Sequence, residues 1–171
     1  MNKRLILLVG KSGSGKNYVA DYLEKEFHMK VLQSYTSRKP RYANEKGHIF
    51  ATEDDFQHMP NKVAMTYYKR HHYWATKEQC DESDIYIIDP QGIKSIQRNY
   101  HGRECVIVYL DVNPFIRFYR MMKRGDGVIK TIGRLWNDYN EFHGFKNKDN
   151  VHVIKRDTVQ NIAAKIFYKV V

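Results

Sequence analysis

The stretch GKSGSGKN, from Gly10 to Asn17, holds the residues best suited to chemistry. It follows the apolar run LILLV and matches the phosphate-loop pattern G-x-x-x-x-G-K-[ST] except at its last position. In such a loop, glycines let backbone N–H groups converge on phosphate oxygens, and the lysine, here Lys16, reaches the outer phosphates. The alternative, a glycine turn that only joins strand to helix, leaves Lys16 unexplained. The residues expected around a nucleotide phosphate are Gly10, Lys11, Ser12, Gly13, Ser14, Gly15, Lys16 and Asn17.

The last position of the pattern holds Asn17 where Ser or Thr usually supplies a hydroxyl to Mg²⁺. An amide oxygen is a neutral ligand of about the same reach, and Mg²⁺ keeps several waters and binds substrate phosphates directly. We therefore expect Asn17 to be a weak Mg²⁺ ligand, directly or through water, that lowers metal affinity without abolishing activity.

A second candidate anion site is SYTSRKPR, from Ser34 to Arg41, which interleaves hydroxyls with two arginines. A guanidinium binds a phosphate through two hydrogen bonds, and nearby hydroxyls complete its shell. Alone, a basic loop is more often simply solvated. Beside a phosphate loop, it suggests phosphoryl transfer between two phosphorylated substrates.

Further arginines stand at helical spacing, because Arg117, Arg120 and Arg124 occupy positions i, i+3 and i+7. A solvated basic face is the alternative. The following RGDG segment and Arg134 favour a functional role for Arg120 and Arg124, whereas Arg117 is expected to be structural.

Asp89 ends the apolar run DIYIID, so it lies at the carboxyl end of a predicted strand, where α/β proteins build their sites. It can hold a Mg²⁺-bound water or cap the helix that follows, and these roles can coexist. His71 and His72 are neighbours on a predicted strand and point to opposite faces, so they are poor joint metal ligands and are expected to be solvated.

Short apolar runs alternate with helical stretches along the chain, which predicts an α/β fold with a parallel sheet. The expected strands are Arg4–Val9, Val31–Gln33, Ile85–Ile88, Val106–Leu110 and Val151–Ile154. The expected helices are Lys16–Phe27, Gln91–Asn99, Pro114–Lys123, Thr131–Phe142 and Val159–Tyr168.

Two segments interrupt this alternation. Residues 34–84 are rich in Tyr, His and charge, with strand-like KVAMTYY and HHYWAT around a helical piece at Glu53–His58, and indicate an α+β insertion. Arg124–Thr131 holds two glycines amid charges and is predicted to be a mobile loop or lid.

Composition limits the alternatives. The 171 residues suffice for one domain, and the net charge of +10 favours polyanionic ligands, either nucleic acid or clustered phosphates. The two cysteines, Cys80 and Cys105, form no CxxC pair and are expected to be reduced thiols in a cytosolic protein. The sequence contains no apolar run of about 18 residues, so no membrane-spanning helix is expected.

Taken together, GKSGSGK, SYTSRKPR, NEKGHIF, YWAT, IIDPQGIKSI, RMMKRG and GRL resemble the guanylate kinase family in order and spacing. The resemblance covers about residues 5–135. It implies a three-layer P-loop fold in one domain: a core of residues 1–33 and 84–171 that holds ATP, a monophosphate-binding insertion at about 34–83, and a lid at about 124–133.

The resemblance also implies roles for particular residues. The acceptor-binding positions are Ser34, Arg38, Arg41, His48, Thr76 and Asp89, of which Asp89 contacts the guanine side. The catalytic positions are Lys16, Arg120, Arg124 and Arg134, and VIKRDT lies near the adenine. Several positions depart from the family, among them Asn17 in the phosphate loop. An ungapped alignment puts Met65 where a glutamate usually reads guanine, Trp74 replaces a tyrosine, and His48 comes closest to a second tyrosine that donates to the acceptor phosphate.

The implied activity is transfer of the γ-phosphoryl group of ATP to GMP or dGMP in the cytoplasm, with Mg²⁺ and without nucleic-acid or membrane partners. Met65 and Trp74 leave open another phosphorylated acceptor. A catalytically silent binding module of the same fold is a further alternative, against which the retained lysine and arginines argue. The sequence indicates no particular oligomeric state.

Overall fold

The computed structural model describes residues 4–145 and 150–169, so the outermost residues of the predicted core segments lie outside the described part. Its main sheet contains β1 (Arg4–Gly10), β6 (Ile85–Ile87), β7 (Glu104–Asp111) and β8 (Val151–Lys155). The strands are all parallel and lie in the order β6-β1-β7-β8. Their carboxyl ends therefore meet at one edge, where β1 runs into the glycine-rich loop.

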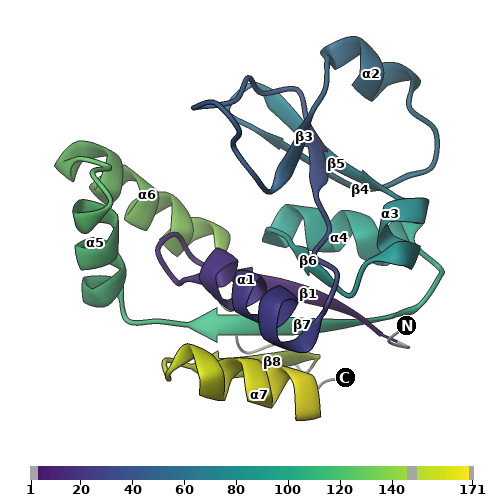
Figure 1. The fold of residues 1–171 in the computed structure, drawn as a ribbon. Coiled ribbons are helices and arrows are strands. Elements are labelled where there is room, and N and C mark those ends of the chain that lie inside the picture. Colours follow the sequence, from purple (N-terminus) through teal and green to yellow (C-terminus); the bar gives the residue numbers. More distant parts are fainter. Residues whose placement is uncertain (1–3, 146–149, 170–171) are drawn as a thin grey trace.

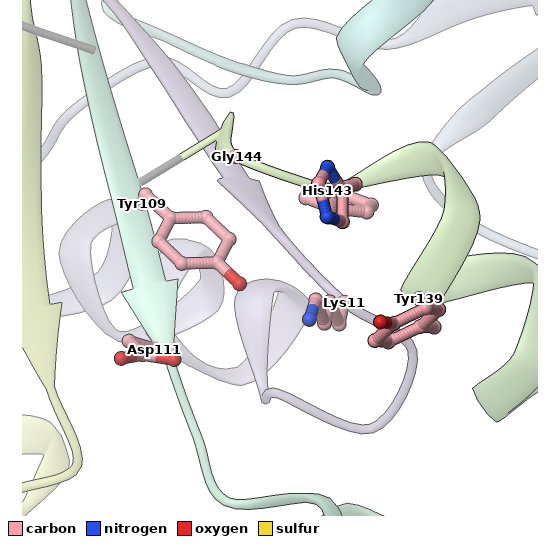
Figure 2. Close-up of a pocket in the computed structure, with 7 residues that line it drawn as sticks. Lys11, Tyr109, Asp111, Tyr139, His143 and Gly144 are labelled. Atoms are coloured by element: carbon pink, nitrogen blue, oxygen red, sulfur yellow. The ribbon is translucent and has the colours of Figure 1, made fainter. Parts of the chain in front are cut away.

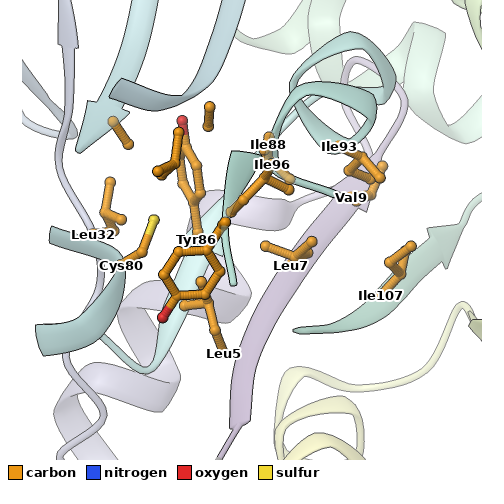
Figure 3. Packing of buried hydrophobic residues seen from close by; sticks show 14 of the residues in the cluster. Leu5, Leu7, Val9, Leu32, Cys80, Tyr86, Ile88, Ile93, Ile96 and Ile107 are labelled. Carbon is orange, nitrogen blue, oxygen red and sulfur yellow. The ribbon is translucent and has the colours of Figure 1, made fainter. Parts of the chain in front are cut away.

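The main sheet is covered on both faces because the side chains of β1 alternate between two apolar clusters. Leu5, Leu7 and Val9 join one cluster, which Figure 3 shows together with Ile93 and Ile96 of α4 (Pro90–Asn99). Ile6 and Leu8 join the other, against α1 (Lys16–Phe27) and α7 (Val159–Lys169). The three-layer α/β fold is thus confirmed (Figure 1).

A second sheet is formed by β2 (Ser34–Thr36), β3 (His48–Phe50), β4 (Lys62–Tyr68) and β5 (His71–Thr76), in the order β3-β2-β5-β4. Only the β2–β3 pair is parallel. The sheet is accompanied by α2 (Glu53–His58) and α3 (Lys77–Glu82), and it lies above α4 in Figure 1.

The remaining helices, α5 (Pro114–Lys123) and α6 (Val128–Glu141), follow β7 and stand side by side at one end of the molecule (Figure 1). The turn between them, residues 124–127, uses Gly125 and Gly127 at φ of 86° and 77°, where a side chain would be strained. None of the helices in the described part is long and apolar enough to cross a membrane.

Two element predictions are wrong. Val31–Gln33 is not a strand: Val31 makes a single bridge to Ile85, and the chain then leaves the main sheet to form β2 at Ser34–Thr36. The predicted loop Arg124–Thr131 is shorter, because α6 begins at Val128 and Thr131 is already helical. Gly127 ends the turn, and its carbonyl accepts from the Thr131 Oγ1 and N atoms, which starts the helix three residues early.

Candidate functional site

The glycine-rich loop joins β1 to α1, which is the strand–loop–helix arrangement expected of a phosphate loop. Gly13 and Gly15 have φ of 75° and 95°, so both use the left-handed region that glycine permits. A Cβ on Gly13 would lie 2.9 Å from the Arg117 carbonyl oxygen, and one on Gly10 would lie 2.7 Å from the Ser14 hydroxyl. Dihedral angle and close packing therefore both require glycine here, and the predicted strand–loop–helix arrangement is confirmed.

The carbonyl groups of the loop are held by cationic side chains. Lys16 Nζ donates to the Gly10 oxygen at 2.5 Å and to the Lys11 oxygen at 3.3 Å. Arg120 donates to the Gly13 and Ser14 oxygens at 3.2 and 3.0 Å. With its carbonyls turned to these cations, the loop can present backbone N–H groups to an anion.

Three carboxylates surround Lys16 and set its electrostatics. Burial lowers the pKa of Lys16 to about 8, an effect that the Asp138 carboxylate opposes most strongly, followed by Glu141 and Asp89. Packing around its carboxyl group and the nearby Asp89 and Asp138 raise the pKa of Glu141 to about 7, although the residue as a whole is exposed. The site thus holds groups that titrate near neutral pH, where a bound phosphate would shift them.

Asp138 and Glu141 were not anticipated from the sequence. They stand three residues apart on α6, the spacing that places two side chains on one helical face. That spacing was the available signal. Nothing in the sequence says that this face turns toward the phosphate loop.

Asp89 caps α4, as one of its predicted roles requires. Its Oδ1 accepts from the Gly92 N–H at 2.7 Å and from the Thr66 hydroxyl at 3.0 Å. Burial raises the pKa of Asp89, and these hydrogen bonds partly offset the rise. Asn17 is exposed in the first turn of α1, next to Lys16.

The four arginines of α5, the turn 124–127 and α6 make three kinds of contact. Arg124 pairs with Asp126 at 2.5 Å, and Arg134 lies 3.2 Å from the same carboxylate. Asp126, in the turn 124–127, therefore binds both arginines. Arg120 instead contacts the phosphate loop. Arg117 is buried, pairs with Asp138 at 2.7 Å and donates to the Ser12 carbonyl of the loop at 3.2 Å.

The arginines of the second candidate anion site already share a carboxylate. Arg38 makes two hydrogen bonds to Glu45, at 2.9 and 3.0 Å, and the Arg41 N–H donates to the same group at 2.7 Å. These contacts, led by the Arg38 hydrogen bond, lower the pKa of Glu45 to about 2. Ser34 Oγ lies 3.0 Å from His48 Nδ1, so these two predicted positions adjoin. Glu45 lies within the NEKGHIF segment, and its role was not predicted from the sequence.

The prediction for Met65 is corrected by the register of β4. Thr66 pairs with Tyr73 and bonds Asp89, so it faces the candidate site. Met65 pairs with Trp74, and successive strand residues point to opposite faces, so Met65 faces away. Trp74 is fully buried on that far face, stacked on Tyr35 at 5.5 Å between ring centroids.

Two further residues differ from expectation or are already engaged. Thr76 is buried and caps α3, where its hydroxyl accepts from the Gln79 N–H while Gln79 returns a bond to the Thr76 N–H. His72 is not simply solvated as predicted: it is largely buried, stacks on Phe56 at 3.8 Å and pairs with Glu53.

A small pocket of about 160 Å³ borders the phosphate loop at Lys11 and the ends of β7 and α6 (Figure 2). Its polar lining comes from Lys11, Asp111, Tyr109, Tyr139 and His143. It includes neither Lys16 nor the arginines, so it lies beside the candidate site.

Comparison with known proteins yields two curated relatives. The chain is 30% identical over 176 aligned residues to a guanylate kinase of Clostridium acetobutylicum. The alignment spans 95% of this chain and 82% of that protein. It is 28% identical over 137 residues to the ribose 1,5-bisphosphate phosphokinase PhnN of Enterobacter lignolyticus, across 73% of this chain and 70% of that protein. No family model matches.

Solved structures support the same fold. A guanylate kinase from Anaplasma phagocytophilum superposes with a TM-score of 0.65 at 16% identity, covering 99% of this chain and 86% of that one. A gluconokinase from Sinorhizobium meliloti gives a TM-score of 0.55 at 12% identity, covering 95% of this chain and 89% of that one. All four proteins are kinases by name.

Proposed function

The chain belongs to the guanylate kinase family, and on that premise we propose that it transfers the γ-phosphoryl group of ATP to GMP or dGMP. The broader class, a guanylate-kinase-like phosphotransferase, follows from family membership. The observation that carries the proposal is the phosphate loop, whose carbonyls are held by Lys16 and Arg120. A glycine turn that only joined strand to helix would need neither cation.

Lys16 and the arginines would do most of the chemical work. Phosphoryl transfer depends on alignment of the reacting oxygens and on neutralisation of the charge that develops on the transferred group. We assign Lys16 to the outer phosphates of ATP, and Arg120, Arg124 and Arg134 to the transferring group. Because Asp126 gathers Arg124 and Arg134, the two can move together when the helices α5 and α6 close over substrates.

Magnesium fits this site only as an ion that arrives with ATP. No group of three or more His, Cys, Asp or Glu side chains in the described residues could hold a metal by itself. Mg²⁺ commonly keeps waters and substrate phosphates as most of its ligands, so the Asn17 amide oxygen and Asp89, through water, would suffice. The ion would neutralise phosphate charge.

The acceptor phosphate is assigned to Arg38 and Arg41, with Ser34 and His48 beside them. For this, the acceptor has to replace Glu45 as the anion between the two arginines. Thr76 we now assign to the cap of α3, because its hydroxyl is occupied there. The unpaired thiols Cys80 and Cys105 are consistent with a cytoplasmic setting, which we propose.

A second candidate acceptor, a phosphorylated sugar, is favoured by one observation. Neither β4 nor β5 contains Asp or Glu, so these strands offer no carboxylate to read the N–H groups of guanine. On the site-facing side of β4 and β5, Ala64 and Ala75 flank Thr66 and Tyr73. The phosphokinase relative is named for a ribose bisphosphate.

The test is ADP release from Mg-ATP against nucleoside monophosphates and ribose bisphosphate. Lys16→Ala is the matched control that excludes contaminating kinases. Turnover with GMP or dGMP and not with other acceptors supports the proposal. Turnover only with the sugar phosphate would show that the acceptor is a sugar phosphate and not a nucleotide, while the phosphoryl-transfer reaction stays as proposed. Folded protein that turns over none of them, at high Mg²⁺, refutes the kinase proposal and favours a binding module.

A further inference from the structure

One residue of the phosphate loop is bound at every polar group by two distant helices. The Ser12 N–H and hydroxyl both donate to the Asp138 carboxylate of α6, at 3.0 Å each. The Ser12 carbonyl accepts from Arg117 of α5 at 3.2 Å. Arg117 in turn pairs with Asp138 at 2.7 Å, which closes the contact into a ring of three residues.

The two charged side chains of this ring are buried. The side chains of Arg117 and Asp138 are 4% and 8% exposed, so water competes little for their hydrogen bonds. Arg117 also donates to the Val112 carbonyl at 3.2 Å, which ties α5 to the end of β7. A buried ion pair is weak evidence for stability, because desolvation offsets its attraction. A role in positioning is the better account of charges that both contact the phosphate loop.

We propose that Asp138, held by Arg117, is a positioning residue that presets the phosphate loop for ATP and fixes α6 against it. Asp138 stands one helical turn from Arg134, so the same contact sets where Arg134 lies relative to the loop. The carboxylate also supports the charge of Lys16 against burial. The proposal rests on the kinase assignment but not on the identity of the acceptor.

The experiment measures MgATP binding by calorimetry without any acceptor, well below the melting temperature of each variant. Asp138→Asn keeps the shape and can still bond Ser12, because its Oδ1 accepts from the N–H and its Nδ2 donates to the hydroxyl, but it removes the negative charge that strengthens these bonds and pairs with Arg117. We expect the Kd for MgATP to rise about tenfold, because the bonds that preset the loop lose their charged acceptor. In turnover assays the KM for the acceptor stays unchanged. Wild-type affinity in Asp138→Asn would overturn the proposal.

A double variant separates positioning from stability. Asp138→Ala alone leaves Arg117 buried without its partner, whereas Arg117→Met with Asp138→Ala removes both charges. Weak MgATP binding by the double variant, with its melting temperature recovered, supports positioning. Recovery of both would mean that the pair only stabilises the fold, and the proposal fails.

Glu104→Gln is the matched control, because its pair with Arg4 lies at the other end of β7. If the wild type binds MgATP but does not turn over GMP, only the assignment of GMP as acceptor is refuted, and the positioning role of Asp138 is unaffected. A wild type that binds no MgATP refutes both.

Discussion

The charge of Lys16 predicts a pH dependence of ATP binding that can be worked out from its surroundings. Burial lowers the pKa of Lys16 to about 8, and a bound phosphate would raise it again by favouring the charged form. A lysine with a pKa of about 8 is roughly nine-tenths protonated at pH 7 and about one-tenth protonated at pH 9. Below pH 8 the free enzyme therefore holds Lys16 ready for phosphate.

Above that pH, binding has to take up a proton. The Kd for MgATP should be nearly constant from pH 7 to about 8, and should then rise about tenfold per pH unit until the pKa of the complex is reached. The assay is a fluorescence titration with MgATP at half-unit steps in constant ionic strength. Below pH 8, Glu141 also titrates, with a pKa of about 7. The variant Glu141→Gln removes this titration, so that the remaining pH dependence of the Kd comes from Lys16.

Lys16→Arg is the second control, because arginine stays charged throughout and should flatten the upper limb. A wild-type Kd that stays constant to pH 9.5 would refute the reasoning. It would mean that the acids around Lys16 keep it protonated in spite of burial.

Three other predictions follow from single contacts. Asn17→Ser should lower the Mg²⁺ concentration for half-maximal activity, since a hydroxyl is the usual ligand there. An unchanged Mg²⁺ titration would mean that Asn17 does not weaken Mg²⁺ binding. Glu45→Gln should destabilise the fold by about 2 kcal/mol at pH 7, measured by urea unfolding, because Arg38, whose side chain is only 11% exposed, loses a charged partner. That difference is fully present above the ordinary Glu pKa of 4.5 and is lost as pH falls toward about 2, so a pH-independent difference would contradict it. Trp74→Ala should cost about 3–5 kcal/mol in the same assay, because the ring is fully buried; a loss below 1 kcal/mol would mean that it is not a core residue.

Local pattern was enough for much of this protein. The residue spacing of the phosphate loop, the bounds of α1 and α5, and the strands β4 and β5 all follow from glycine, proline and apolar placement. These features depend on interactions between near neighbours in the chain, which a sequence displays directly. The missed helix α3 also had a local signal, the Thr76–Gln79 capping box.

Tertiary structure decided which groups meet. The ungapped alignment with the family placed Met65 at the candidate site, but pairing with β5 turns it to the far face, since a shift of one residue reverses every side chain of a strand. The sequence left Arg117 structural without naming a partner. Asp138 reaches Ser12 across 126 positions of chain only because α5 and α6 pack beside the loop. Glu45 lies close to Arg38 in sequence, yet only the fold shows it between the two arginines. Contacts of this kind depend on strand register and helix packing over long separations, and a local residue pattern does not carry that information.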